Sequence, residues 1–180
     1  SVTTALNTIA IGQSALSSVT TGNKNVAVGN QAGNTITTGA NNMCLGENAQ
    51  PSSATVSNEI TLGNSNNGTL RCQTQTISSL SDERDKTNIV DIEDGLDLIN
   101  LLKPRKFTWA MREPSANDGK TEVGFIAQEL DEVLGNKNDY IHAVSHSNPD
   151  KLEASYGRFM PILVKAVQEL SAKVTALEAG

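Results

Sequence analysis

Ser81 and Lys86 are the residues of this sequence whose types and spacing could carry out chemistry on the chain itself. The serine hydroxyl can attack the carbonyl of Leu80 through a five-membered ring, which converts the peptide bond into an ester that water then opens. A serine hydroxyl is a weak nucleophile until a base removes its proton. A lysine can be that base only where burial or neighbouring cations lower its pKa and leave it neutral near pH 7.

The pair also has a plainer interpretation. Positions i and i+5 do not share a helical face, so the two side chains need a loop or a turn to meet. Ser81 could be only a helix N-cap or a loop residue, followed by a solvated run of charges at residues 82–86. Within that run, Arg84 could supply a cation near the lysine, whereas Asp82 and Asp85 would oppose its effect if they lay too close.

Charge and aromatic content change abruptly at this point of the chain. The 180 residues carry a net charge of -6, which gives no reason to expect nucleic acid as a partner. The first 80 residues contain two basic residues, two acidic residues and no aromatic residue. The rest contains 12 basic residues, 18 acidic residues and all six aromatic residues. We therefore expect two domains, residues 1–80 and residues 81–180.

The first 80 residues contain a repeat with a period of 17. Its four copies read NTIAIGQSA, KNVAVGNQA, NNMCLGENA and NEITLGNSN. The glycines that close the copies are equally spaced, at Gly12, Gly29, Gly46 and Gly63. Each copy holds a short apolar strand, which buries little by itself and has to stack on its neighbours.

The central residue of each of these strands is small, and this predicts a crowded axis that three chains could approach. These residues are Ala10, Ala27, Cys44 and Thr61. The copies resemble the NVAVG-type repeats of trimeric autotransporter adhesin heads and the β-helical shafts of phage tail fibres, across about residues 3–66. We therefore expect an all-β repeat that forms an intertwined or stacked trimeric β-helix, with a monomeric β-solenoid as the alternative. A repeat this regular can slip by a whole turn at little cost, so something outside it should hold the chains in register.

The second half is predicted to be an α+β domain. A helix is expected over residues 94–102, because Leu98, Leu101 and Leu102 share a face and Pro104 ends it. KFTWA is expected to be a strand, TEVGFIAQELDEVLG a strand that leads into a helix ending at Gly135, and YIHAVSHSNPDKLEASY a hairpin.

The last segment is predicted to be a long helix that can form a coiled coil. Apolar residues alternate at spacings of three and four, which is the pattern of a coiled-coil seam. The seam consists of Met160, Leu163, Val167, Leu170, Val174 and Leu177. An ordinary amphipathic core helix is the alternative, because the pattern covers fewer than three heptads.

No metal or other cofactor is expected. Cys44 and Cys72 lie 28 positions apart, without the spacing of zinc ligands, and His142 and His146 fall in the hairpin-like segment, where their spacing does not converge. The sequence has neither a phosphate-binding loop nor a dinucleotide fingerprint. It also has no run of about 18 apolar residues, so we expect no insertion into a membrane.

Four motifs occur in order along the second half: LSDERDKTNI, LLKPRKFTW, GFIAQEL and MPILVKAVQEL. Together they resemble the C-terminal intramolecular chaperone auto-processing domain of phage tailspikes and tail fibres, the S74 peptidase family. The resemblance covers residues 80 to about 178. It implies a self-cleaving serine peptidase that acts once, in cis, with Ser81 as nucleophile and Lys86 as general base. The cleaved bond would be Leu80–Ser81, and Asp82 and Arg84 are assigned a supporting role.

The resemblance also implies a biological setting. The domain would form a homotrimer, hold the three chains of an upstream fibre in register, and release itself once trimer assembly has created the dyad geometry. The mature fibre would be part of the virion, assembled in the cytoplasm of the bacterial host, with a host-cell surface receptor as its partner. The alternative from another class is a non-enzymatic trimeric adhesin head with a coiled-coil stalk, in which the junction is only a loop.

Overall fold

The computed structural model describes residues 4–74, 76–112 and 115–180. The chain forms two compact units, which are described separately. One unit comprises Ser1–Leu70, Thr108–Glu122 and His146–Lys151, and the other comprises Arg71–Phe107, Val123–Ser145 and Leu152–Gly180. The division into residues 1–80 and 81–180 stays a prediction.

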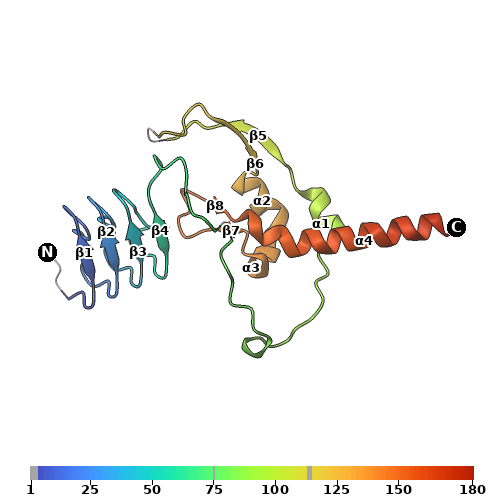
Figure 1. Ribbon diagram of the computed structural model, residues 1–180, viewed down its shortest axis with the longest axis horizontal. Helices are drawn as coiled ribbons and strands as arrows, with labels where there is room; N and C mark the ends of the chain where they lie inside the picture. Colours follow the sequence, from blue (N-terminus) through green and yellow to red (C-terminus); the bar gives the residue numbers. More distant parts are fainter. Residues whose placement is uncertain (1–3, 75, 113–114) are drawn as a thin grey trace. The chain divides into compact units, whose positions relative to one another are not determined.

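Four short strands form one parallel sheet in the first unit (Figure 1). They are β1 (Ile9–Ile11), β2 (Val26–Val28), β3 (Met43–Leu45) and β4 (Ile60–Leu62), and they pair in that order. The register advances by one repeat of 17 residues, because Ile9 pairs with Val26 and Val26 pairs with Met43. The period seen in the sequence is therefore the spacing between strands that lie next to each other.

The expected trimeric β-helix is wrong. The structure has a four-stranded parallel sheet with three residues in each strand, formed within one chain, and the described residues contain no extended β-helical region. Ala27 and Cys44 are buried, but they pack against residues of their own chain, not against an axis shared by three chains. Their neighbours in this core are Leu16, Val19, Ala32, Ile36 and Ala49. At Ala27 and Cys44 a small residue fits because the turns of the same chain fold back closely over the sheet, whereas Ala10 is exposed and Thr61 is half-buried.

The glycines that close the strands are required by close approach of the backbone. Gly29 has φ +137°, a conformation that residues with a Cβ rarely adopt. A Cβ at this position would lie 2.5 Å from the carbonyl carbon of Gly46 in the next turn. The tight turn expected after each strand is present.

Two buried asparagines join successive turns of the first unit. Asn25 Nδ2 donates to the carbonyl oxygen of Gly39 at 2.8 Å, and its Oδ1 accepts from the backbone N–H of Asn42 at 3.0 Å. Asn42 makes the same two bonds one turn later, to Val56 and from Glu59. Because buried polar groups need partners, this ladder fixes the register of the turns.

The remaining elements are a mixture of helices and short strands, as expected for an α+β domain. In chain order they are η1 (Glu83–Asp85), α1 (Leu96–Leu101), β5 (Arg105–Thr108), β6 (Thr121–Gly124), α2 (Ala127–Leu134), η2 (Gly135–Lys137), α3 (Asn138–Ile141), β7 (Val144–Ser145), β8 (Glu153–Ala154), η3 (Tyr156–Phe159) and α4 (Met160–Glu178). β5 pairs with β6, and β7 pairs antiparallel with β8. Tyr140 and Ile141, which we expected in the hairpin, belong to α3 instead.

The second unit has its own apolar core, and α1 packs along α4 within it. The core consists of Leu98, Leu130, Leu134, Ile141, Ala143, Val144, Phe159 and Ile162. The rings of Phe125 and Tyr156 meet edge to face at the border of this core, with centroids 5.3 Å apart. Of the face predicted for α1, Leu98 lies in this core and Leu102 packs against it, whereas Leu101 is 59% exposed, so the prediction is wrong for Leu101. The predicted second helix supplies Leu130 and Leu134.

The start of α1 is held from two sides. The Asp94 carboxylate accepts hydrogen bonds from Lys137 Nζ and from the hydroxyl of Tyr140. These two bonds lower the pKa of Asp94. Next to it, the backbone N–H of Leu96 donates to Glu169 on α4 at 2.8 Å. The chain that leads from the junction into the helical core is therefore anchored at this point.

Replacing Asn25 by Ala should destabilise the first unit. The Gly39 carbonyl and the Asn42 N–H would lose their buried partner, and an unsatisfied buried polar group costs roughly 1–3 kcal/mol. We expect the free energy of unfolding to fall by about 2–4 kcal/mol in chemical denaturation followed by circular dichroism. Asn30→Ala, at an exposed position, is the matched control and should change it by less than about 0.5 kcal/mol. Equal losses in the two variants would contradict a structural role for the ladder.

Replacing Asp94 by Asn should destabilise the second unit at neutral pH but not in acid. The folded-state pKa of Asp94 is lowered from its ordinary value of 3.8, so its interactions stabilise the fold above that value. This stabilisation disappears as pH falls through the folded-state pKa. Thermal unfolding of the two proteins should therefore differ at pH 7 and converge in acid. Asp91→Asn, at an exposed position, serves as the control, and a difference that persists unchanged in acid would refute the assignment.

Candidate active site

The described chain brings Ser81 and Lys86 into contact. Lys86 Nζ donates to Ser81 Oγ at 2.6 Å and to the carbonyl oxygen of Ser81 at 3.0 Å. The two residues therefore meet through a turn, as their spacing requires. This contact forms within one chain, so we infer that trimer assembly is not needed to bring the two side chains together.

The turn between them is the 3₁₀ helix η1, and Asp82 caps its N-terminus. The Asp82 carboxylate accepts the backbone N–H of Arg84 at 2.9 Å. The backbone N–H of Lys86 donates to the carbonyl oxygen of Glu83 at 3.0 Å and closes the turn. Asp82 is a preferred residue type at such a cap, because its carboxylate satisfies an N–H that has no partner within the helix.

Asp82 and Arg84 form an ion pair with each other. The guanidinium donates to both carboxylate oxygens, from Nε at 2.9 Å and from Nη2 at 2.7 Å. These bonds from Arg84 lower the pKa of Asp82. The charge of Arg84 is thus balanced locally by Asp82, which limits its effect on Lys86. The supporting role assigned to the two residues stays a prediction.

The whole junction is open to water in one chain. Leu80, whose carbonyl carbon would be attacked, is 100% exposed, and Ser81 and Lys86 are exposed as well. Two further apolar side chains nearby, Ile77 at 97% and Val90 at 81%, are also exposed. A lysine becomes a base by losing its proton, and burial is the main factor that favours the neutral form. The described chain therefore supplies the contact but not the burial.

The predicted coiled-coil seam lies on α4 and is exposed throughout. Its residues are Met160, Leu163, Val167, Leu170, Val174 and Leu177, with exposures between 42% and 82%. The opposite side of the same helix faces the core through Ile162 and Ala166. The helix therefore has an inner apolar face that packs within the chain and a second apolar face without cover from it. Association through this second face stays a prediction.

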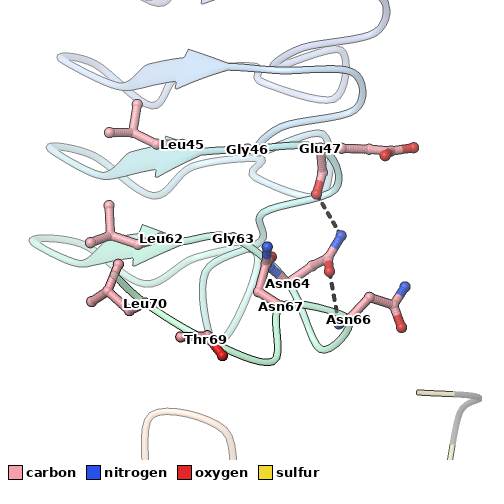
Figure 2. Close-up of a pocket in the computed structure, with 10 residues that line it drawn as sticks. All are labelled: Leu45, Gly46, Glu47, Leu62, Gly63, Asn64, Asn66, Asn67, Thr69 and Leu70. Carbon is pink, nitrogen blue, oxygen red and sulfur yellow. Dashed lines mark hydrogen bonds between the residues drawn. The ribbon is translucent and has the colours of Figure 1, made fainter. Parts of the chain in front are cut away.

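A hollow of about 510 Å³ lies at the last turn of the first unit (Figure 2). Its lining residues are Leu45, Gly46, Glu47, Leu62, Gly63, Asn64, Asn66, Asn67, Thr69 and Leu70. Asn64 Nδ2 donates to the carbonyl oxygen of Glu47 at 2.7 Å, and Asn64 Oδ1 accepts from the N–H of Asn66 at 2.8 Å. These side chains hold the final turn in place, so the hollow has a structural explanation, and its lining includes neither Ser81 nor Lys86.

Sequence reasoning missed the anchor formed by Asp94, Lys137, Tyr140 and Glu169. These residues lie up to 75 positions apart in the chain, and no motif joins them.

The two cysteines lie in different environments. Cys44 is buried, and this burial raises its pKa to about 11, whereas Cys72 is exposed. No described helix is both long enough and apolar enough to cross a membrane.

Parts of the chain are similar to one viral protein and to one protein family. An uncharacterized protein VP1 of Micromonas pusilla reovirus is 50% identical over 60 residues, which is 32% of this chain and 3% of that protein. The chain thus spans only a small part of this relative's length, and no solved structure matches. The family described as chaperone of endosialidase, the S74 peptidase family, matches residues 81–138. The part of the chain that begins at Ser81 is therefore similar to the chaperone of endosialidase family.

Proposed function

We propose that the second half of the chain is an intramolecular chaperone for a phage tail fibre or tailspike, and that it releases itself by cutting the Leu80–Ser81 bond. It would form a homotrimer and hold three upstream chains in register while they fold. The chain would then be divided into residues 1–80, which stay with the virion, and residues 81–180, which leave. A host-cell surface receptor would be the partner of the mature fibre.

One observation carries this proposal. Lys86 Nζ lies 2.6 Å from Ser81 Oγ, and the match to the chaperone of endosialidase family begins at the same serine. A serine that contacts an amine is the arrangement needed for a nucleophile and its base. The position supports a cut in cis, because the bond to be cleaved is the one immediately before the nucleophile.

The proposed reaction has two steps. Lys86 takes the hydroxyl proton of Ser81 while Oγ attacks the carbonyl carbon of Leu80. The carbon–nitrogen bond then breaks, the nitrogen of Ser81 takes up a proton and becomes a free amine, and Leu80 is left as an ester on Oγ. Water hydrolyses this ester to the Leu80 carboxylate and restores the Ser81 hydroxyl. Each chain therefore reacts once.

Assembly would contribute burial to this reaction. A lysine that is open to water holds its proton near neutral pH, whereas removal from water favours the neutral amine. In one chain the junction is exposed together with Ile77, Leu80 and Val90, so other copies of the chain are the proposed cover. Cleavage would then follow assembly, and the fibre would keep its register through a slow rate of unfolding once the chaperone has left.

The cleavage itself is tested on a denaturing gel. Purified wild-type protein should separate into two fragments of about 80 and 100 residues, and mass spectrometry should find a new C-terminus at Leu80 and a new N-terminus at Ser81. Ser81→Ala removes the nucleophile and Lys86→Ala removes the base, so each should leave one full-length band.

The neighbouring Ser79→Ala is the matched control and should be cut like wild type, because its hydroxyl is not next to the cleaved bond. A wild-type chain that stays intact after prolonged incubation as a trimer would refute the proposal. That result would favour the non-enzymatic adhesin head with a coiled-coil stalk.

The link between assembly and cleavage is tested on the α4 seam. Val167→Asp introduces a charge on the exposed apolar face and should prevent association, because burying an unpaired carboxylate is unfavourable. We expect cleavage to slow by about tenfold or more, measured as the fraction cut over time beside the mass from light scattering. Gln168→Asp, one position along the helix and outside the seam, should associate and cut normally. A monomeric Val167→Asp protein that cuts at the wild-type rate would show that assembly is not required.

A further inference from the structure

Asn67 and Gly68 are the only asparagine in the sequence that is followed by a glycine, and they lie in the last turn of the first unit. Both residues are exposed, and neither belongs to a helix or a strand. The backbone nitrogen after an asparagine can close a five-membered ring on the side-chain carboxamide carbon, and a glycine at that position has no Cβ to obstruct the approach. The pair is therefore able to react chemically, and its surroundings decide whether it does so in the folded chain.

The backbone nitrogen of Gly68 is available for this attack. Among the residues that the structure describes, the N–H of Gly68 donates to no acceptor. A backbone nitrogen attacks only after it loses its proton, and a hydrogen bond that held this proton in place would oppose the reaction. Apart from adjacent residues, a Cβ placed on Gly68 would find only Lys120 Nζ within 4 Å, at 3.7 Å. The space beside Gly68 is therefore open.

The carboxamide of Asn67 is held in place by the turn. Its Oδ1 accepts the backbone N–H of Asn64 at 2.6 Å, and the N–H of Asn67 donates to the carbonyl oxygen of Asn64 at 3.0 Å. Gly63 packs against the same oxygen, since a Cβ there would lie 2.2 Å from Oδ1 (Figure 2). Attack on the carboxamide carbon moves negative charge onto Oδ1, and a donor already aimed at that oxygen stabilises such a charge.

We propose that Asn67 is a site of spontaneous modification, at which the nitrogen of Gly68 displaces the side-chain amide and residue 67 becomes aspartate or isoaspartate. The nitrogen bonds to the carboxamide carbon, the bond from this carbon to Nδ2 breaks, and ammonia leaves with the proton that Gly68 gives up. Water then opens the ring at either of its two carbonyl groups. One opening gives aspartate, and the other gives isoaspartate, in which the main chain runs through the former side chain. The reaction consumes only water and does not depend on the proposed cleavage.

The two products affect the turn differently. Aspartate keeps an oxygen for the N–H of Asn64 and leaves the main chain unchanged. Isoaspartate lengthens the main chain by a carbon atom, so the two hydrogen bonds between Asn64 and residue 67 cannot both keep their geometry. The last turn of the repeat should therefore loosen as the protein ages, in the part of the chain that precedes Ser81.

The modification is tested by ageing a Ser81→Ala chain, which stays at full length, in mildly alkaline buffer. Peptide mapping by mass spectrometry follows the replacement of the amide by a carboxylate at residue 67, and a methyltransferase specific for isoaspartate distinguishes the two products. Asn67 should be converted at least as fast as in the same chain unfolded in urea. The rate should rise with pH, because the attacking nitrogen has to lose its proton.

Gly68→Ala in the same background is the matched variant. The φ angle of Gly68 is not positive, and the added Cβ meets no backbone, so this variant should fold normally. It should slow the conversion of Asn67 by about tenfold or more, because the Cβ obstructs the attack. Asn67→Asp reproduces the aspartate product, and when fresh it should unfold at the temperature of the fresh Ser81→Ala chain. The aged Ser81→Ala chain should unfold at a lower temperature than the aged Gly68→Ala chain.

An Asn67 that stays intact in the folded chain but reacts in urea would overturn the inference, because the fold would then protect the residue. Conversion at the same rate in Gly68→Ala would equally refute attack by this nitrogen. Isoaspartate that forms without lowering the unfolding temperature would refute the loosening of the turn. Because every chain compared carries Ser81→Ala, none of these results depends on whether the wild-type protein is cut.

Discussion

The contact between Lys86 and Ser81 exists in a chain that leaves both side chains in water, and this combination governs how the molecule can act. The turn capped by Asp82 needs only residues that are close in sequence. Proton transfer from the hydroxyl needs a neutral amine, which exposure to water disfavours. The contact between the two side chains and the ability of the amine to accept a proton therefore depend on different features of the molecule. The geometry comes from six consecutive residues, whereas reactivity requires a change in solvation.

The rest of the chain is consistent with such a change. Ile77, Leu80 and Val90 lie close to the junction in the sequence and are exposed, and so are the seam residues on the outer face of α4. Large contiguous apolar patches on a protein surface mark sites of interaction. If one event covers both surfaces, association and cleavage are coupled without any moving part. The hydrogen bond from Leu96 to Glu169 connects the segment that follows the junction to α4.

Several elements could be predicted from local patterns. The helices α1, α2 and α4 follow from apolar spacing, from Pro104 and from Gly135, because these signals act over a few residues. The hairpin was predicted less well, since Tyr140 and Ile141 belong to α3, where Tyr140 bonds to Asp94 and Ile141 enters the core. Tertiary contacts therefore determined the secondary structure of these two residues, and the local sequence pattern did not.

By itself, the sequence determined the 17-residue period, the change of character near residue 80 and the presence of a lysine five positions after a serine. Each of these depends on residue type and on short or regular spacing. Only the tertiary structure decided that Ala27 and Cys44 face the turns of their own chain, because a small residue fits equally well against a neighbouring chain or against its own backbone. It alone also revealed the bonds from Lys137, Tyr140 and Glu169 to the start of α1, since contacts between residues far apart in sequence are created only when the chain folds.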